Sequence, residues 1–170
     1  IVITTNSGLW RYLIGDTVRF TSLNPYRIRV SGRTKHHINV FGEELMVENT
    51  DQAIAKACQI TQTEVVDYTV APIFMEGKEK GAHEWMIEFK QNPSDLAQFQ
   101  KIVDDTLQSL NSDYEAKRHN NMTLTPLVIN LARPQLFYDW LKERDKLGGQ
   151  HKIPRLSNQR EYLDQLKALN

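Results

Sequence analysis

Three polar stretches of this sequence contain side chains that could bind or transform a charged substrate. The first is "GLWRYLIGDTVRF", residues 8–20, in which Asp16 directly follows Gly15. A carboxylate at such a turn can accept two hydrogen bonds at once, and the two hydroxyls of a ribose offer that pair of donors. The spacing alone is equally typical of an ordinary turn aspartate, which is the more common case.

The second stretch is "SGRTKHHINVFGEE", residues 31–44, where basic side chains gather beside a sharp turn. Arg33 follows Gly32, and Lys35, His36 and His37 come next. An arginine fork matches the planar acceptors of a carboxylate or a phosphate. The alternative is a solvated basic loop. The two histidines lack neighbouring cysteines or carboxylates at ligand spacing, so no metal site is expected.

The third stretch, "GGQHKIPR" at residues 148–155, could deliver one ammonium group to an anion. Lys152 lies between two glycines and a proline. The alternative is an ordinary exposed lysine in a connecting loop, which is the more common case. The sequence has no glycine-rich phosphate loop that ends in a lysine. Cys58 falls on a predicted buried helix face rather than in a nucleophile motif. A site for phosphate chemistry would therefore need further residues from outside this chain.

Composition excludes several classes of protein. The chain has 170 residues, 21 basic and 21 acidic, and a formal net charge of zero, whereas proteins that bind nucleic acid through phosphates carry a basic excess. The single cysteine excludes an internal disulfide and fits a reducing compartment, so we expect a cytoplasmic protein that does not enter a membrane. The opening "IVITTNSG" is no signal peptide and reads as a strand that starts abruptly, which suggests a chain cut from something longer.

The elements that must position these groups follow from the apolar periodicity. Residues 17–23 and 26–30 alternate as strands of a short β-meander. From residue 45 the predicted order is helix, strand, strand, helix, strand, helix, helix, with residues 64–74 and 81–89 as a hairpin. The second of these helices is expected to start at Asn92-Pro93, the polar residues 111–121 to form a loop, and residues 122–131 to form the third strand, interrupted by Pro126. This order predicts an α+β fold: a small mixed β-sheet with helices packed on it, preceded by the meander and a hinge. The expected core contains aromatic residues from strands and helices: Trp85, Phe89, Phe99, Phe137 and Trp140.

Taken in order, the three stretches resemble the auxin-responsive family of acyl acid–amido synthetases, within the adenylate-forming enzymes. That family has a "GLYRYRxGD"-like segment, a Gly-Arg strand end leading to a Gly-Glu turn, and a "GQxKxPR"-like motif near its end. The resemblance covers essentially the whole chain. It implies the carboxyl-terminal region of a ligase, with residues 1–31 as the β-rich tail of the large adenylation domain and linker, and residues 32–170 as the small domain.

The resemblance also implies roles around a nucleotide. Asp16 matches the aspartate that holds the ribose hydroxyls of ATP, and Arg33 matches an arginine near the ribose and phosphates. Arg11 and Tyr12 would line the nucleotide pocket. Trp10 departs from the family pattern, where a smaller aromatic residue stands.

Further roles concern movement and catalysis. Lys35 falls at the hinge between the two domains, and Lys152 matches a lysine that would contact the α-phosphate or the acyl carboxylate. His151 replaces an aromatic residue of the family motif. The implied cofactors are ATP and Mg²⁺ in the full-length enzyme. The implied partners are the missing amino-terminal adenylation domain, a carboxylic acid and an amino acid, and neither nucleic acid nor membrane. The fragment alone would be inactive.

Two other readings of the residues stay open. One is an autonomous binding module that recognises RNA or a protein through the basic turn, although zero net charge and the lack of an aromatic stacking motif count against RNA. The other is a small-molecule sensor on a ferredoxin-like sheet. The residues do not identify the acid, the amine or the oligomeric state.

Overall fold

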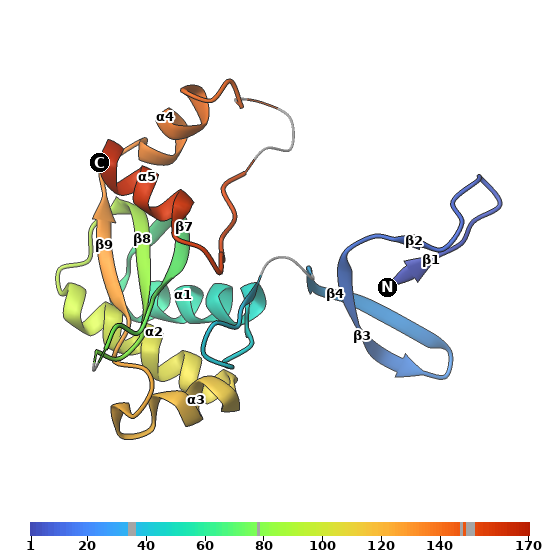
Figure 1. Ribbon diagram of the computed structural model, residues 1–170, viewed down its shortest axis with the longest axis horizontal. Helices are drawn as coiled ribbons and strands as arrows, with labels where there is room; N and C mark the ends of the chain where they lie inside the picture. The colour runs from blue at the N-terminus through green and yellow to red at the C-terminus, as the bar shows by residue number, and fades with distance from the viewer. Residues whose placement is uncertain (34–36, 78, 147, 149–151) are drawn as a thin grey trace.

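The computed structural model describes residues 1–33, 37–77, 79–146, 148 and 152–170, and of residues 31–33 only the backbone. The chain opens with two β-hairpins (Figure 1). In the first, β1 (Val2–Ile3) pairs with β2 (Tyr12–Leu13). In the second, β3 (Asp16–Leu23) pairs antiparallel with β4 (Tyr26–Arg33). The predicted strands are present, but they form two separate hairpins rather than one meander, since the described strands β2 and β3 do not pair with each other.

A second group of elements follows and forms most of the molecule. The short strands β5 (His37–Ile38) and β6 (Leu45–Met46) pair before α1 (Val47–Thr61). Strand β7 (Glu64–Ile73) runs antiparallel to β8 (Ala82–Gln91), and β9 (Val128–Ala132) adds to the other side of β8 in parallel. The result is a mixed sheet in the order β7-β8-β9.

Helices cover both faces of this sheet because side chains alternate along β8. Trp85 and Ile87 belong to one buried cluster with α1 and α2 (Leu96–Leu110). Met86, between them, belongs to a second buried cluster with α4 (Leu136–Lys142) and α5 (Glu161–Leu169). Successive strand residues point to opposite faces, so the two helix pairs lie on opposite sides of the sheet. The predicted aromatic core is buried throughout.

The structure corrects several predicted boundaries. The polar stretch expected as a loop forms α3 (Ser112–Arg118) and a short 3-10 turn (His119–Asn121). The strand expected over residues 122–131 begins only at Val128, after Pro126. Helix α2 begins after the cap Asp95, not at the predicted Asn92-Pro93 start. None of these changes alters the predicted fold class, which is confirmed.

No helix in the described ranges is long and apolar enough to cross one.

Candidate functional site

Asp16 and Arg33 lie directly opposite each other, at the open end of the β3–β4 hairpin. Their Cα atoms are register partners across the two strands. The main-chain oxygen of Asp16 accepts a hydrogen bond of 2.8 Å from the amino group of Ile1, which ties the start of the chain to this point. The two residues are 17 positions apart in the sequence, and the hairpin brings their backbones together.

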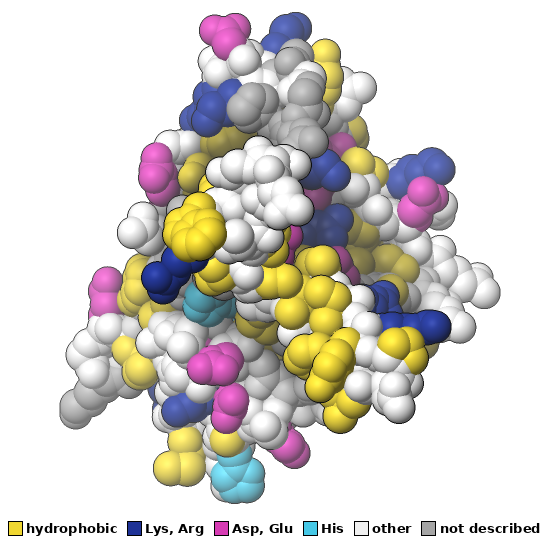
Figure 2. All heavy atoms as spheres, turned by 90° about the vertical axis from the view of Figure 1, so that its right-hand side faces the viewer, with side chains coloured by type: hydrophobic (Ala, Val, Ile, Leu, Met, Phe, Trp, Pro, Cys, Tyr) yellow, Lys and Arg dark blue, Asp and Glu magenta, His cyan; other side chains and the backbone are white. Residues whose placement is uncertain are grey.

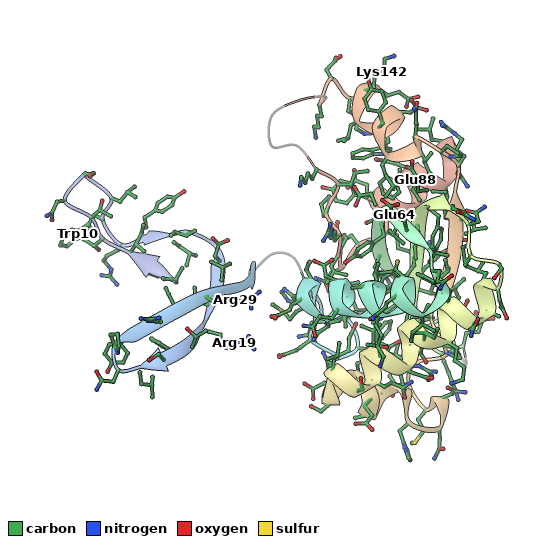
Figure 3. The ribbon with its side chains drawn as sticks, turned by 180° about the vertical axis from the view of Figure 1, so that it is seen from behind. Trp10, Arg19, Arg29, Glu64, Glu88 and Lys142 are labelled. Atoms are coloured by element: carbon green, nitrogen blue, oxygen red, sulfur yellow. The ribbon has the colours of Figure 1, made fainter. Side chains whose placement is uncertain are left out.

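Arg11 and Tyr12 come from the neighbouring hairpin. Arg11 adopts a positive φ of 48°, and its backbone N–H donates to the Thr4 hydroxyl at 3.1 Å. Tyr12 pairs with Ile3 and its side chain is exposed. Trp10, at the tip, is 79% exposed and projects away from the hairpin (Figure 3). The side chains that would face a nucleotide are therefore exposed here.

Lys152 lies on the other part of the molecule, beside β7. It is exposed, and the residues after it run along that strand. Its positive charge, with that of Arg155, partly offsets the effect of burial on Asp67, whose pKa is raised by burial above its ordinary value. Within the described ranges no hydrogen bond or ion pair joins Lys152 to the two hairpins. Lys152 and Asp16 are therefore not assembled into one site in this conformation.

The predicted hinge lysine, Lys35, lies outside the described residues, and so do His36 and His151. Arg33 is described by its backbone alone. The predicted boundary between residues 31 and 32 falls in β4, just before the undescribed segment, and stays a prediction.

Arg19 and Arg29 form a basic pair that the sequence analysis did not single out. They are register partners in the β3–β4 hairpin, and Figure 3 labels both on it. Like charges directly opposite each other destabilise a strand pair. No ion pair with either arginine is found in the described part of the chain. The alternation in "VRF" and "RIR" is the available signal in the sequence, and by itself it indicates strand periodicity only.

A buried ion pair holds the segment that follows the hinge. The carboxylate of Glu43 lies 2.9 Å from Nε2 of His83, and both side chains are fully buried. Burial would raise the pKa of Glu43, but the hydrogen bond and charge of His83 and two backbone N–H groups outweigh it and lower the pKa. Glu43 also accepts the Phe41 N–H at 2.7 Å. Nothing local in the sequence links Glu43 with a histidine forty residues away.

A second buried network anchors α3 to α2. Arg118 donates to both carboxylate oxygens of Asp104, and the Tyr114 hydroxyl donates to the same carboxylate at 2.6 Å. The Tyr114 ring stacks on His83 at a centroid distance of 5.5 Å. The stacking of Tyr114 on His83 joins the two networks, and these buried contacts explain why a polar stretch folds as a helix.

Arg155 and Asn158, also missed, fasten the stretch that bears Lys152. Arg155 pairs with Asp51 of α1 at 2.5 Å, and its guanidinium lies 5.2 Å from the centre of the Tyr68 ring. Asn158 donates to the His37 carbonyl at 2.8 Å and accepts the Asn39 N–H at 2.9 Å. Their partners lie about a hundred residues away in the sequence or more, so sequence spacing offered no signal.

Metal-binding potential was judged from the donor set. Among the described side chains, no three His, Cys, Asp or Glu residues gather in a way that could hold an ion.

Solved structures of acyl acid amido synthetases share this fold. The structure described as "GH3.15 acyl acid amido synthetase" is 24% identical with a TM-score of 0.75, over 98% of this chain and 31% of that one. The structure "AtGH3.15 acyl acid amido synthetase in complex with 2,4-DB" is 22% identical with a TM-score of 0.72, over 98% of this chain and 32% of that one. The chain thus spans about a third of the length of these relatives.

The family model of the GH3 family C-terminal domain matches residues 48–161, and that of the GH3 family central domain matches residues 1–33. The chain belongs to the GH3 family and represents its carboxyl-terminal region. A search of curated proteins gave no match.

Proposed function

We propose that this chain is the carboxyl-terminal part of an ATP-dependent ligase that adenylates a carboxylic acid and transfers the acyl group to an amine, such as an amino acid. The observation that supports this most is the match of both GH3 domain models, in order, along one chain. The three predicted motifs lie within or beside the matched ranges. The amino-terminal adenylation domain, the acid and the amine are proposed partners.

In the first step, a carboxylate oxygen of the acid attacks the α-phosphorus of ATP, and the bond to the pyrophosphate oxygen breaks. Negative charge grows on oxygens that already carry charge. A fixed cation stabilises such a transition state far better in a closed, water-poor site than in bulk water. Lys152 would supply that cation, while Asp16 would accept hydrogen bonds from the ribose hydroxyls. Arg33, Arg11 and Tyr12 would line the nucleotide.

In the second step, the amine nitrogen attacks the acyl carbon, AMP leaves with the electron pair of the acyl–oxygen bond, and the nitrogen loses a proton. Because Lys152 and the hairpins are not joined in the described contacts, the site would have to assemble by rotation about the segment near Lys35. Such closure also excludes water that would hydrolyse the adenylate. Mg²⁺ would be bound together with ATP, because this ion is usually held by substrate phosphates and one or two carboxylates.

The 170-residue chain alone would be inactive, because it lacks a phosphate loop and an acyl pocket. A cytoplasmic location fits the single free cysteine and is part of the proposal.

The experiment is acid-dependent exchange of pyrophosphate into ATP by the longer protein that contains this chain, with a panel of carboxylic acids. We expect exchange that requires one class of acid, and the Asp16→Ala variant should raise the Kd for ATP about tenfold, as expected for lost hydrogen bonds to a charged group. No exchange with any acid would contradict the proposed reaction. An unchanged Kd for ATP would remove Asp16 from the nucleotide site.

A further inference from the structure

The stretch that begins at Lys152 is held along β7 like an additional short strand. The Val70 N–H donates to the Arg155 carbonyl at 2.8 Å, and the Ser157 N–H donates to the Val70 carbonyl at 3.1 Å. The Thr69 hydroxyl donates to the Pro154 carbonyl at 2.7 Å. Residues 154–157 are therefore fixed in register, and Lys152 projects from just before this fixed run.

Apolar anchors hold the same run against both sides of the sheet. Ile153 is 5% exposed and lies in the cluster with α4 and α5, whereas Leu156 is 1% exposed and lies in the cluster with α1 and α2. Lys152 precedes the first anchor by one residue. The backbone that carries its ammonium group is thus tied to the body of the domain.

Arg155 connects this run to α1. Its guanidinium donates to Oδ1 of Asp51, which also accepts the Tyr68 hydroxyl at 2.6 Å, and the guanidinium lies over the Tyr68 ring. The Tyr68 hydroxyl is shared with Thr50 at 2.8 Å. Arg155 and Asp51 are 44% and 43% exposed, so water screens the pair and its contribution to folding stability is small. Its geometry orients the chain more than it stabilises it.

Asn158 connects the run to the chain that leaves the predicted hinge. Its amide bonds both the His37 carbonyl and the Asn39 N–H, which pins β5 from two sides. The stretch from Lys152 to Asn158 is thereby bonded at its end to β5 and along its length to β7 and α1. A rotation that moves β5 carries this stretch with it.

We infer that Arg155 and Asn158, with Asp51 as the partner of Arg155, are positioning residues that hold the backbone of Lys152 in register with β5, β7 and α1, so that its ammonium group has a set place in the proposed reaction. This inference rests on the proposed function and adds residues to it. Each of the three is assigned a role that acts through Lys152.

The test is a double-mutant cycle in the longer protein, with Asp51→Asn and Lys152→Ala. Asp51→Asn should lower kcat for pyrophosphate exchange about 10- to 100-fold, the cost expected of a misplaced catalytic group. KM for ATP should change less than about twofold and Tm less than about 2 °C, because the pair is exposed. In the Lys152→Ala background, Asp51→Asn should have no further effect.

The matched control is Asp105→Asn, which removes another exposed carboxylate, paired with Lys101 on α2, and should leave kcat unchanged. Full activity of Asp51→Asn, or an equal loss in the Lys152→Ala background, would overturn the inference. Should Asp51→Asn fold poorly, Arg155→Lys retains the charge but loses the planar fork, and the same cycle applies.

A readout without activity separates this inference from the proposed reaction. In the 170-residue chain, Asp51→Asn should speed amide hydrogen exchange at Ser157 and Val70, whereas Asp105→Asn should not. Unchanged protection would overturn the positioning role, whatever reaction the enzyme performs. A different pair of results would separate the two proposals. If the wild-type enzyme does not exchange pyrophosphate into ATP but Asp51→Asn still speeds amide hydrogen exchange, the proposed reaction is contradicted, while the contact between Asp51 and the Lys152 stretch is supported.

Discussion

At the scale of single residues, the Glu43–His83 pair shows how a polar contact can be buried beside a hinge. Both side chains are fully buried and the pair also satisfies the Phe41 N–H. Removing one partner of such a pair leaves the other without compensation. Glu43→Ala should therefore lower the free energy of unfolding by about 3 kcal/mol, measured by urea denaturation at pH 7. A loss below 1 kcal/mol would show that the pair is not formed.

The same pair sets a dependence of stability on pH. The pKa of Glu43 is lowered in the folded state, so its contribution is present above the unfolded pKa and is lost as the pH falls through the folded value. The wild-type chain should lose stability below about pH 4.5 more steeply than Glu43→Gln, whose amide does not titrate. Denaturation curves from pH 3 to pH 6 compare the two. Parallel pH profiles would contradict the assigned shift.

Gly81 marks a close approach between β8 and the turn after the hinge. A Cβ atom at this position would lie 2.6 Å from the Phe41 ring and 3.2 Å from the Leu124 side chain. Gly81→Ala should therefore cost about 1–3 kcal/mol through overpacking, measured by chemical denaturation. Phe41→Leu in the same chain should recover part of this loss. If the losses of the two single variants simply add in the double variant, the strain does not come from contact between residue 81 and the Phe41 ring.

At the scale of elements, the apolar strands β7 and β8 could be predicted from the sequence and the polar helix α3 could not. Trp85, Ile87 and Phe89 alternate with their neighbours, so β8 was evident. Helix α3 has no apolar stripe, and its stability depends on Arg118 and Asp104, which only the tertiary fold brings together. The Asn92-Pro93 pair carries the usual start signal, yet the side chain of Asp95 caps α2.

Asp95 gives a direct test of that start. Its side chain accepts the Gln98 N–H at 2.9 Å. Asp95→Ala should lower the free energy of unfolding by about 1 kcal/mol, whereas Asn92→Ala should change it by less than about 0.5 kcal/mol. Thermal denaturation of both variants distinguishes them. A larger loss of stability in Asn92→Ala than in Asp95→Ala would show that Asn92 caps the helix, as the sequence predicts.

At the scale of the whole molecule, the two hairpins carry many exposed apolar side chains, and the buried clusters contain none of them. Figure 2 faces this end of the molecule and shows hydrophobic and basic side chains gathered on it. Trp10, Leu23 and Tyr26 are each at least 70% exposed. Both core clusters begin only after residue 37. An exposed apolar surface of this extent is typical of an interface with another part of a protein.

Removal of residues 1–33 tests this division. The free energy of unfolding of the remaining chain should stay within about 1 kcal/mol of the full chain, because no described core residue is lost. Binding of a hydrophobic dye should fall. A large loss of stability would show that the hairpins contribute to the core. The site motifs were recognisable from sequence, and the resemblance already placed Asp16 and Lys152 in different domains. The contacts that fasten the Lys152 stretch to α1 and β5 were not predictable, because they join residues more than a hundred positions apart.

The central claim is that Lys152 acts in adenylation when the two parts come together, and one measurement tests it most directly. The Lys152→Ala variant of the longer protein is compared with Lys142→Ala, which removes an exposed lysine at the end of α4 (Figure 3), in acid-dependent exchange of pyrophosphate into ATP. We expect Lys152→Ala to lower exchange about 10²- to 10³-fold and Lys142→Ala to leave it unchanged. Undiminished exchange by Lys152→Ala would contradict the account.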